Sequence, residues 1–171
     1  HLRERHFNQN LHKAWFSDVE DLMTFPLWNL SGQMVGFQQY RPFAPKEKCN
    51  SPREGRYFTY RNKDTVTVWG LESWLLSNTL FLTEGVFDAC RLTNLGYSAV
   101  ALLSYDPSKT TKNWLYNVRQ SRPVVSVCDN DASGTGLKLA KYGHTNHLCP
   151  PEMDMGDVSD DYVDEFLRGY D

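Results

Sequence analysis

The sequence predicts an α/β fold for its carboxy-terminal half, with a mainly parallel sheet of roughly four strands flanked by helices. Three observations support this: short runs are apolar along their whole length, amphipathic segments separate these runs, and glycines stand where helical patterns end. Strands that are apolar on both faces and joined through helices form parallel sheets with right-handed crossovers. The expected strands are residues 79–83, 97–104, 123–128 and 144–149, and the expected helices are residues 85–96, 109–120 and 134–143.

A smaller mixed α+β lobe is expected to precede this sheet. Residues 1–23 have apolar side chains near helical spacing, which indicates an amphipathic helical lead-in. Residues 24–43 alternate apolar and polar side chains around a Ser31–Gly32 turn, which predicts a β-hairpin. A proline-containing loop over 41–55 and a return to strand character over 56–70 complete the lobe.

Composition and charge bound the domain organisation. The chain has 171 residues, of which 40% are hydrophobic and 13% aromatic, and this is ample for a core. Residues 1–75 carry ten Lys and Arg against eight Asp and Glu, whereas residues 76–171 carry eight against 13. We expect one lobe over 1–76 and a second domain, with a closing helix, over 77–171. No apolar stretch approaches the roughly 20 residues of a membrane-spanning helix, so we expect no membrane and a cytoplasmic location.

Four cysteines are scattered without a C-x-x-C pair, so the spacing of a zinc ribbon is absent and no zinc is expected. Isolated cysteines in apolar runs are mostly small buried residues in a reducing compartment. His144 and His147 stand near one of them, but side chains on a short strand point to alternating faces, which disfavours a metal site there. The cysteines are Cys49, Cys90, Cys128 and Cys149.

Acidic residues follow two of the expected strands at the point where each strand ends. Glu84 comes directly after the strand at 79–83, and Asp129 and Asp131 follow the strand at 123–128. Because the carboxyl ends of parallel strands meet at one edge of the sheet, we expect these side chains to lie together. The helix after Glu84 and the segment after the last strand add three more acids: Asp88, Asp154 and Asp157.

Clustered carboxylates repel one another and resist desolvation, so they indicate a bound cation. Mg²⁺ prefers carboxylate oxygens and completes its shell with water and substrate phosphates. Each acid also has a plainer explanation, because Glu84 and Asp88 suit the first turn of a helix, and Asp129 and Asp131 could cap the helix that follows them. The joint pattern favours the magnesium site: a strand, then TEG and D-A, and later a strand followed by D-x-D-x-S-G.

A resemblance strengthens this interpretation. TEGVFDA at 83–89 and CDNDASG at 128–134 closely resemble the two signature motifs of the TOPRIM domain, which topoisomerases, bacterial-type primases and some nucleases share. The segment at 25–43, NSP at 50–52 and WGLE at 69–72 look like the lobe before TOPRIM in DnaG-type primases and phage primase-helicases. DMGDVSDDYVDEFL resembles the closing acidic motif and helix of that family.

The resemblance extends over residues 24–167 and implies a TOPRIM fold and nucleotidyl transfer, in which a 3′ hydroxyl attacks the α-phosphate of a nucleoside triphosphate and pyrophosphate leaves. It implies two or more Mg²⁺ or Mn²⁺ ions, with Glu84, Asp129 and Asp131 catalytic. The implied metal ligands are Glu84, Asp88, Asp129, Asp131, Asp154 and Asp157. Implied partners are a single-stranded DNA template, nucleoside triphosphates, and a replicative helicase or helicase domain. We therefore expect the core of a bacterial or phage DNA primase that synthesises short primers.

Basic and aromatic residues are interleaved in the amino-terminal lobe, a mixture that binds phosphates and stacks on single-stranded bases. The aromatic residues of this stretch are Tyr40, Phe43, Tyr57, Phe58 and Tyr60. Aromatic side chains in strands also serve the core, so both roles stay open. The expected nucleic-acid or nucleotide contacts are Arg41, Lys46, Lys48, Asn50, Arg53, Arg56, Arg61 and Lys63.

Two other functions could use the same residues. A TOPRIM nuclease would activate water in place of a sugar hydroxyl, and a nonenzymatic nucleic-acid-binding module would keep only the fold. The hairpin and the NSP segment favour the primase, and the intact set of Glu84, Asp129 and Asp131 disfavours the nonenzymatic module. A topoisomerase is least favoured, since no companion domain carries a nucleophilic tyrosine. The zinc module that precedes the core in family primases is not in this sequence, so we expect a fragment or a small stand-alone relative.

Overall fold

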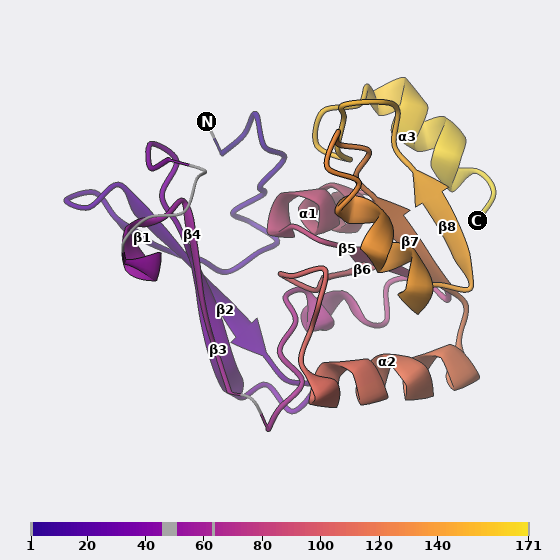
Figure 1. Ribbon diagram of the computed structural model, residues 1–171, viewed down its shortest axis with the longest axis horizontal. Helices are drawn as coiled ribbons and strands as arrows, with labels where there is room; N and C mark the ends of the chain where they lie inside the picture. The colour runs from indigo at the N-terminus through magenta and orange to yellow at the C-terminus, as the bar shows by residue number, and fades with distance from the viewer. Residues whose placement is uncertain (1, 46–50, 63, 171) are drawn as a thin grey trace.

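The computed structural model describes residues 2–45, 51–62 and 64–170. Within them the chain forms two four-stranded sheets (Figure 1), with strand orders β1-β2-β3-β4 and β6-β5-β7-β8. The first sheet is antiparallel and the second is parallel throughout, which confirms the predicted α/β class. No described helix combines the length and the apolar character needed to span a membrane.

The antiparallel sheet contains the predicted hairpin. Its strands are β1 Trp15–Ser17, β2 Leu22–Trp28, β3 Met34–Tyr40 and β4 Tyr57–Arg61. The turn between β2 and β3 is held by Asn29, whose Oδ1 accepts from the backbone N–H groups of Ser31 and Gln33. Gly32 has a φ of +75°, a left-handed conformation that favours glycine. The turn chemistry at Ser31–Gly32 therefore fixes this hairpin as predicted.

The helical lead-in predicted over residues 1–23 is wrong. The described part of that stretch consists of turns up to residue 12, and then Trp15–Ser17 forms an edge strand on β2. The apolar spacing has another cause, because Phe7 is buried in the core while Trp15 stays half-exposed on the sheet. Tertiary pairing has overridden local periodicity here, so the helical elements described in the lobe are two short 3₁₀ turns, η1 Pro52–Glu54 and η2 Leu71–Ser73.

The parallel sheet and its helices follow the predicted order. The strands are β5 Leu80–Thr83, β6 Ser98–Ala101, β7 Val124–Cys128 and β8 Thr145–Leu148, and the α-helices are α1 Val86–Asn94, α2 Lys109–Ser121 and α3 Asp160–Leu167. The helix expected over 134–143 is instead a 3₁₀ helix, η3 Gly136–Tyr142. Leu139 O, which would accept an α-helical bond, accepts from Ser126 Oγ, and Gly143 N donates to Ala140 O.

Both faces of the parallel sheet are covered. On one face Phe81, Val125 and Val127 pack with α1, α3 and the antiparallel sheet. On the other face Leu82 and Leu115 belong to a second cluster that includes α2 and η3. Figure 1 shows α2 and α3 on opposite sides of the sheet. The strands β5, β6 and β7 are therefore buried on both faces, as their sequences predicted, whereas the edge strand β8 is largely exposed. Cys90, Cys128 and Cys149 are buried thiols within this packing, and Cys49 lies outside the described residues.

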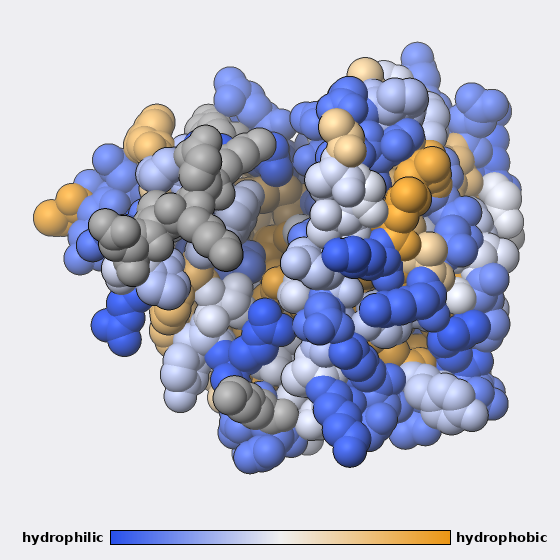
Figure 2. All heavy atoms as spheres, in the orientation of Figure 1, coloured by the Kyte–Doolittle hydropathy of each residue, from blue (hydrophilic) through white to orange (hydrophobic). Residues whose placement is uncertain are grey.

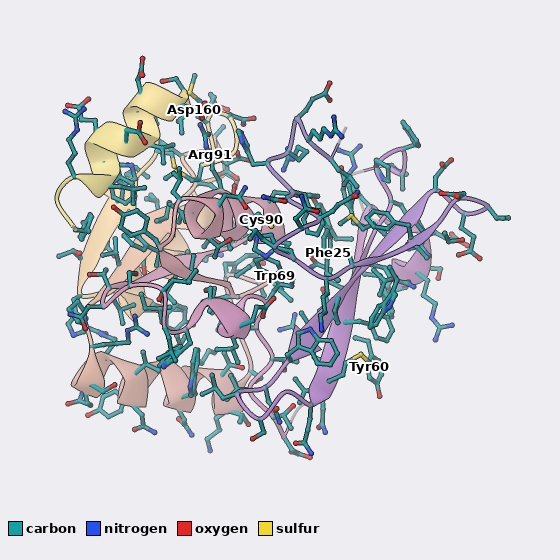
Figure 3. The ribbon with its side chains drawn as sticks, turned by 180° about the vertical axis from the view of Figure 1, so that it is seen from behind. Phe25, Tyr60, Trp69, Cys90, Arg91 and Asp160 are labelled. Atoms are coloured by element: carbon teal, nitrogen blue, oxygen red, sulfur yellow. The ribbon has the colours of Figure 1, made fainter. Side chains whose placement is uncertain are left out.

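The two sheets share one hydrophobic core. The Phe25 ring on β2 is fully buried and lies 5.7 Å from the Phe87 ring on α1, with an edge-to-face orientation. Trp69, which connects the lobes, exchanges two backbone hydrogen bonds with Ala101 at the edge of β6. Figure 3 shows Phe25 and Trp69 where the antiparallel sheet approaches α1. This contact fixes the position of the first lobe over the carboxyl ends of the parallel strands.

Replacing Phe25 with alanine tests that shared core. The Phe25 ring also lies 5.3 Å from Phe7, so its removal leaves a cavity that reaches both lobes. We expect Phe25→Ala to lower the free energy of unfolding by about 3–5 kcal/mol, the usual cost of deleting a buried phenylalanine ring. Urea denaturation followed by tryptophan fluorescence measures it, with Phe43→Ala, at a ring that is 82% exposed, as the matched control. A cost below about 1 kcal/mol would contradict a core common to both sheets.

Candidate functional site

A pocket of about 490 Å³ lies between the two sheets. One wall of the pocket is formed by the inner face of β3 and β4. The opposite wall is formed by the segments that follow β5 and β7. Figure 2 shows the molecule hollowed between its two lobes. Four of the six predicted acids line this pocket: Glu84, Asp88, Asp129 and Asp154. The prediction that carboxylates from separate segments meet at the strand ends agrees with this arrangement.

The link from β5 to α1 places the first two acids. Glu84 follows the last residue of β5, and Gly85 is the residue before the first turn of α1. A side chain at Gly85 would meet Asp88 Oδ2 at 2.8 Å from its Cβ, so glycine leaves space for that carboxylate. Asp88 is 5% exposed, and its Oδ1 atom is buried without a hydrogen-bond partner among the described residues. An unpaired buried carboxylate oxygen is costly and points to a missing ligand.

The segment after β8 brings the next acids together. Asn130 N donates to Met153 O, and Glu152 N donates to Asn130 O, so the loop that carries Asp154 is bound to the end of β7 beside Asp129. Asp154 Oδ1 accepts from the backbone N–H of the residue two positions on, Gly156. These backbone bonds position the two carboxylates from segments that are far apart in the sequence.

Burial and mutual repulsion raise the pKa values of the pocket acids. The pKa of Asp129 is raised to about 7, first by burial and then by Asp154 and Glu84. The pKa of Asp88 is raised by burial, Asp154 and Asp129, and that of Glu84 by burial and the charge of Asp131. The pKa of Asp154 is also raised, chiefly by burial. These shifts share one cause, because ionised acids crowd a partly desolvated space.

Asp131 and Asp157 lie at the rim and not on the pocket wall. Both are exposed, and the Oδ1 atom of Asp131 accepts a hydrogen bond from Ser133 Oγ at 2.8 Å. The charge of Asp131 still raises the pKa of Glu84, and that of Asp157 raises the pKa of Asp154. The six predicted acids therefore form one electrostatic group, of which four members are in the pocket and two are in solvent.

The donor set fits a hard divalent cation. Carboxylate oxygens are the ligands that Mg²⁺ and Mn²⁺ prefer. Among the described residues, Asp88 Oδ1 accepts no hydrogen bond and could serve as such a ligand. No group of three or more histidine, cysteine, aspartate or glutamate side chains among the described residues is already disposed to hold a metal ion. The acids are thus close enough to raise one another's pKa values, but common coordination of one ion would require their side chains to turn toward it.

Arg5 is a pocket residue that the sequence did not predict. It lines the pocket with Asp88 and Asp154, and its guanidinium carbon lies 4.8 Å from the centre of the Phe87 ring. Its positive charge lowers the pKa of both acids, against the larger effect of burial. The wrong helical prediction for residues 1–23 left this arginine without an expected position, and the sequence carries no other signal for it.

The basic residues predicted to contact nucleic acid or nucleotide lie in different places, and not all of them border the pocket. Arg56 lines the pocket, and its Nε donates to Ala44 O. Arg53 lies over the Phe58 ring at 5.8 Å, and Arg61 is at the far end of β4. Arg41 is partly buried and contacts Gln39 through a 3.4 Å hydrogen bond. Four predicted contacts lie outside the described residues: Lys46, Lys48, Asn50 and Lys63.

Strand register separates the aromatic residues onto two faces. Tyr40 pairs with Tyr57 across β3 and β4, and these stacked rings line the pocket. Phe37 pairs with Tyr60, and these rings stack 5.4 Å apart on the opposite face. Phe58 lies on that face as well, because side chains alternate along a strand. The outer face therefore presents an aromatic surface with the Arg53 guanidinium beside it.

The raised pKa of Asp129 predicts the pH dependence of the metal-free protein. The folded state holds this proton up to about pH 7, whereas the unfolded chain loses it near the ordinary aspartate pKa of 3.8. This residue therefore makes the free energy of unfolding fall as pH rises between the two values. Asp129→Asn should match the wild type near pH 4 and melt at a higher temperature above pH 7 in a chelator. Thermal unfolding across this range measures it, and Asp164→Asn, on the exposed side of α3, is the control. An Asp129→Asn effect that does not vary with pH would refute the shift.

Comparison with known proteins gives structural matches alone. No protein-family model matches the chain, and no curated protein matches it by sequence. A DNA primase domain from Pseudomonas aeruginosa superposes with a TM-score of 0.64 at 14% identity, covering 92% of this chain and 56% of that one. The zinc-binding and RNA polymerase domains of Aquifex aeolicus primase give 0.63 at 20% identity, covering 90% and 40%. The primase fragment of the bacteriophage T7 primase-helicase gives 0.65 at 15% identity, covering 95% and 68%.

These matches agree with the resemblance seen in the TOPRIM motifs. The chain spans about half the length of the bacterial primase structures. Its parallel sheet, flanking helices and preceding antiparallel sheet follow the same arrangement over nearly the whole chain. The protein thus has the fold of the TOPRIM-containing catalytic core of DnaG-type primases.

Proposed function

We propose that this chain is the catalytic core of a DNA primase, which joins nucleoside triphosphates into short oligonucleotides on a single-stranded DNA template. The observation that carries the proposal is the pocket of four carboxylates at the ends of β5 and β7, where burial and repulsion raise pKa values. A primase fold supports the reaction class. The motif residues Glu84 and Asp129 both lie in this pocket.

We assign each pocket acid a role in this proposed reaction. Asp129, Asp154 and Asp88 would bind divalent metal, because these three acids line one pocket and raise one another's pKa values. Mg²⁺ or Mn²⁺, when bound, supplies positive charge that stabilises the developing charge on phosphate and favours an ionised hydroxyl. Glu84 would accept the proton of the attacking 3′ hydroxyl, since its raised pKa makes it a better base than an ordinary glutamate. The pocket would hold both reactants in line.

The proposed partners follow from the two faces of the antiparallel sheet. Solved structures with this fold include a DnaG primase catalytic domain bound to single-stranded DNA, at a TM-score of 0.56 and 16% identity, which supports a DNA template. The inner face, with Arg56, borders the reaction pocket and suits a nucleotide. The outer face, with stacked Phe37 and Tyr60, suits template bases. The match to a primase-helicase fragment supports a helicase partner or a helicase domain in a longer protein.

Substitution of the pocket acids tests the proposal directly. Single-stranded DNA, ribonucleotides and Mg²⁺ should yield short oligonucleotides with the wild-type chain. Glu84→Gln and Asp129→Asn should each reduce the rate roughly a hundredfold or more, the scale seen when a group that stabilises transition-state charge is removed. Labelled products separated on a denaturing gel give the rate.

The exposed acid Asp164 provides the matched control, because Asp164→Asn removes a charge on α3 and not in the pocket. It should retain wild-type synthesis. Cleaved DNA without oligonucleotide synthesis would replace the proposal with the nuclease alternative. Equal synthesis by Glu84→Gln and the wild type would remove the proposed base.

The outer aromatic surface generates a second test. Tyr60 is 57% exposed and stacks on Phe37, so its ring can receive a template base. Base stacking on an aromatic side chain contributes about 1–3 kcal/mol, so Tyr60→Ala should weaken single-stranded DNA binding roughly tenfold. Fluorescence anisotropy of a labelled oligonucleotide measures this.

Tyr116 is the comparison residue, because it is 66% exposed and lies on α2 and not on the antiparallel sheet. Tyr116→Ala should bind DNA as the wild type does. An equal loss in both variants, or no loss in Tyr60→Ala, would rule out the outer face as the template surface.

A further inference from the structure

The segment before β1 holds one arginine inside the carboxylate pocket. Phe7 is 3% exposed and packs on Phe25, which anchors the segment in the shared core. Backbone bonds from Arg5 and Phe7 to Leu2 O close a compact turn, and Asn94 Nδ2 donates to His6 O from the end of α1. The position of Arg5 is therefore fixed by its neighbours on both sides.

Arg5 differs from the structural arginines of this chain. Arg91 donates to Met155 O and Val158 O and pairs with Asp160 at 2.6 Å. Figure 3 labels Arg91 and Asp160, which lie near each other beside α3. Arg122 donates to three carbonyl oxygens, those of Trp74, Ser77 and Asn78. Both guanidiniums use their donors to bind segments together. By contrast, Arg5 Nε is buried and has no hydrogen-bond partner within residues 2–45, 51–62 and 64–170.

The surroundings of Arg5 include an equally unsatisfied acid. Asp88 Oδ1, in the same pocket, is buried and unpaired, so the guanidinium and this carboxylate oxygen are not joined in a satisfied ion pair. The guanidinium carbon of Arg5 lies 4.8 Å from the centre of the Phe87 ring, so this ring holds the charged group at the pocket wall. Arg56, the residue before β4 begins, lines the same pocket. Two guanidiniums thus border a cavity whose other wall is acidic.

We propose that Arg5 binds phosphate oxygens of the incoming nucleoside triphosphate, and that Arg56 faces it across the pocket. This inference rests on the proposed function and names a substrate-binding residue for the same site. A guanidinium presents paired N–H donors that match phosphate geometry, and such charge-assisted bonds are strong in a partly desolvated pocket. The carboxylates and their metal would then hold one side of the triphosphate while Arg5 holds another.

A purely structural role for Arg5 would be to neutralise the acids. The two roles predict different effects of removing the charge. Loss of Arg5 takes a cation out of an acidic pocket, so Mg²⁺ alone should bind more tightly, whichever role is correct. Only the phosphate-binding role requires that ATP bind more weakly once Mg²⁺ is saturating.

The experiment compares Arg5→Gln with the wild type by isothermal titration calorimetry, first with Mg²⁺ alone and then with ATP in saturating Mg²⁺ without template. We expect ATP affinity to fall about tenfold or more, the effect of losing hydrogen bonds to a charged group, while Mg²⁺ affinity rises. Arg5→Lys should keep the wild-type Mg²⁺ affinity and show an intermediate ATP affinity. Arg3→Gln is the matched control, because Arg3 is exposed on the same turn and lies outside this pocket.

Each outcome decides one of the two proposals. Unchanged ATP affinity in Arg5→Gln overturns the inference. A parallel loss of Mg²⁺ and ATP binding with a lowered melting temperature overturns it too, because the substitution has then disrupted the folded pocket. A wild-type chain that does not bind ATP overturns it as well. ATP binding that depends on Arg5, without oligonucleotide synthesis, supports the inference and removes the primase assignment. Oligonucleotide synthesis by a chain whose ATP affinity does not depend on Arg5 supports the primase assignment and overturns the inference about Arg5.

Discussion

Repulsion among carboxylates that are partly removed from water is the constraint on which this structure depends. Four acids share one pocket, and burial and neighbouring charge raise their pKa values in the absence of a cation. The folded chain tolerates this cost because rigid elements hold the acids from different directions. Arg91 joins α1 to the segment at 155–158, so the loop with Asp154 stays against the helix with Asp88. The fold therefore holds these carboxylates in a mutual repulsion that a bound cation would relieve.

The sequence predicted the parallel sheet well because its information is local. Runs such as residues 124–128 are apolar on both faces, and α1 ends near Gly96, whose φ is +90°. The strand ends then follow from topology, which is why Glu84 and Asp129 were expected together. The lead-in was not predictable in this way. Trp15 has apolar neighbours at helical spacing, but the partner strand β2 determines its conformation.

The sequence pattern also did not predict which face of the strand β4 lines the pocket. Tyr57 and Tyr60 are separated by two residues and look equivalent in the sequence, yet one lines the pocket and the other stacks with Phe37 outside. Strand register assigns them, and a one-residue change in register would exchange the two faces. The hidden position of Arg5 has the same origin, because only the packing of Phe7 in the shared core places it. Long-range contacts, and not composition, complete this site.

The charge of the pocket has a consequence for the order in which ligands bind. The pocket has four acids and two guanidiniums, so it becomes net negative and repels a free triphosphate once more than two of the acids are ionised. On the proposed function, divalent cations would reverse that sign, after which the guanidiniums and the metal would attract the phosphates together. On the proposed function, the nucleotide would therefore enter with metal or after it. Protons compete with that metal, since a carboxyl with a pKa of about 7, such as Asp129, is half neutral at neutral pH. On the proposed function, nucleotide affinity should thus depend on pH through metal binding.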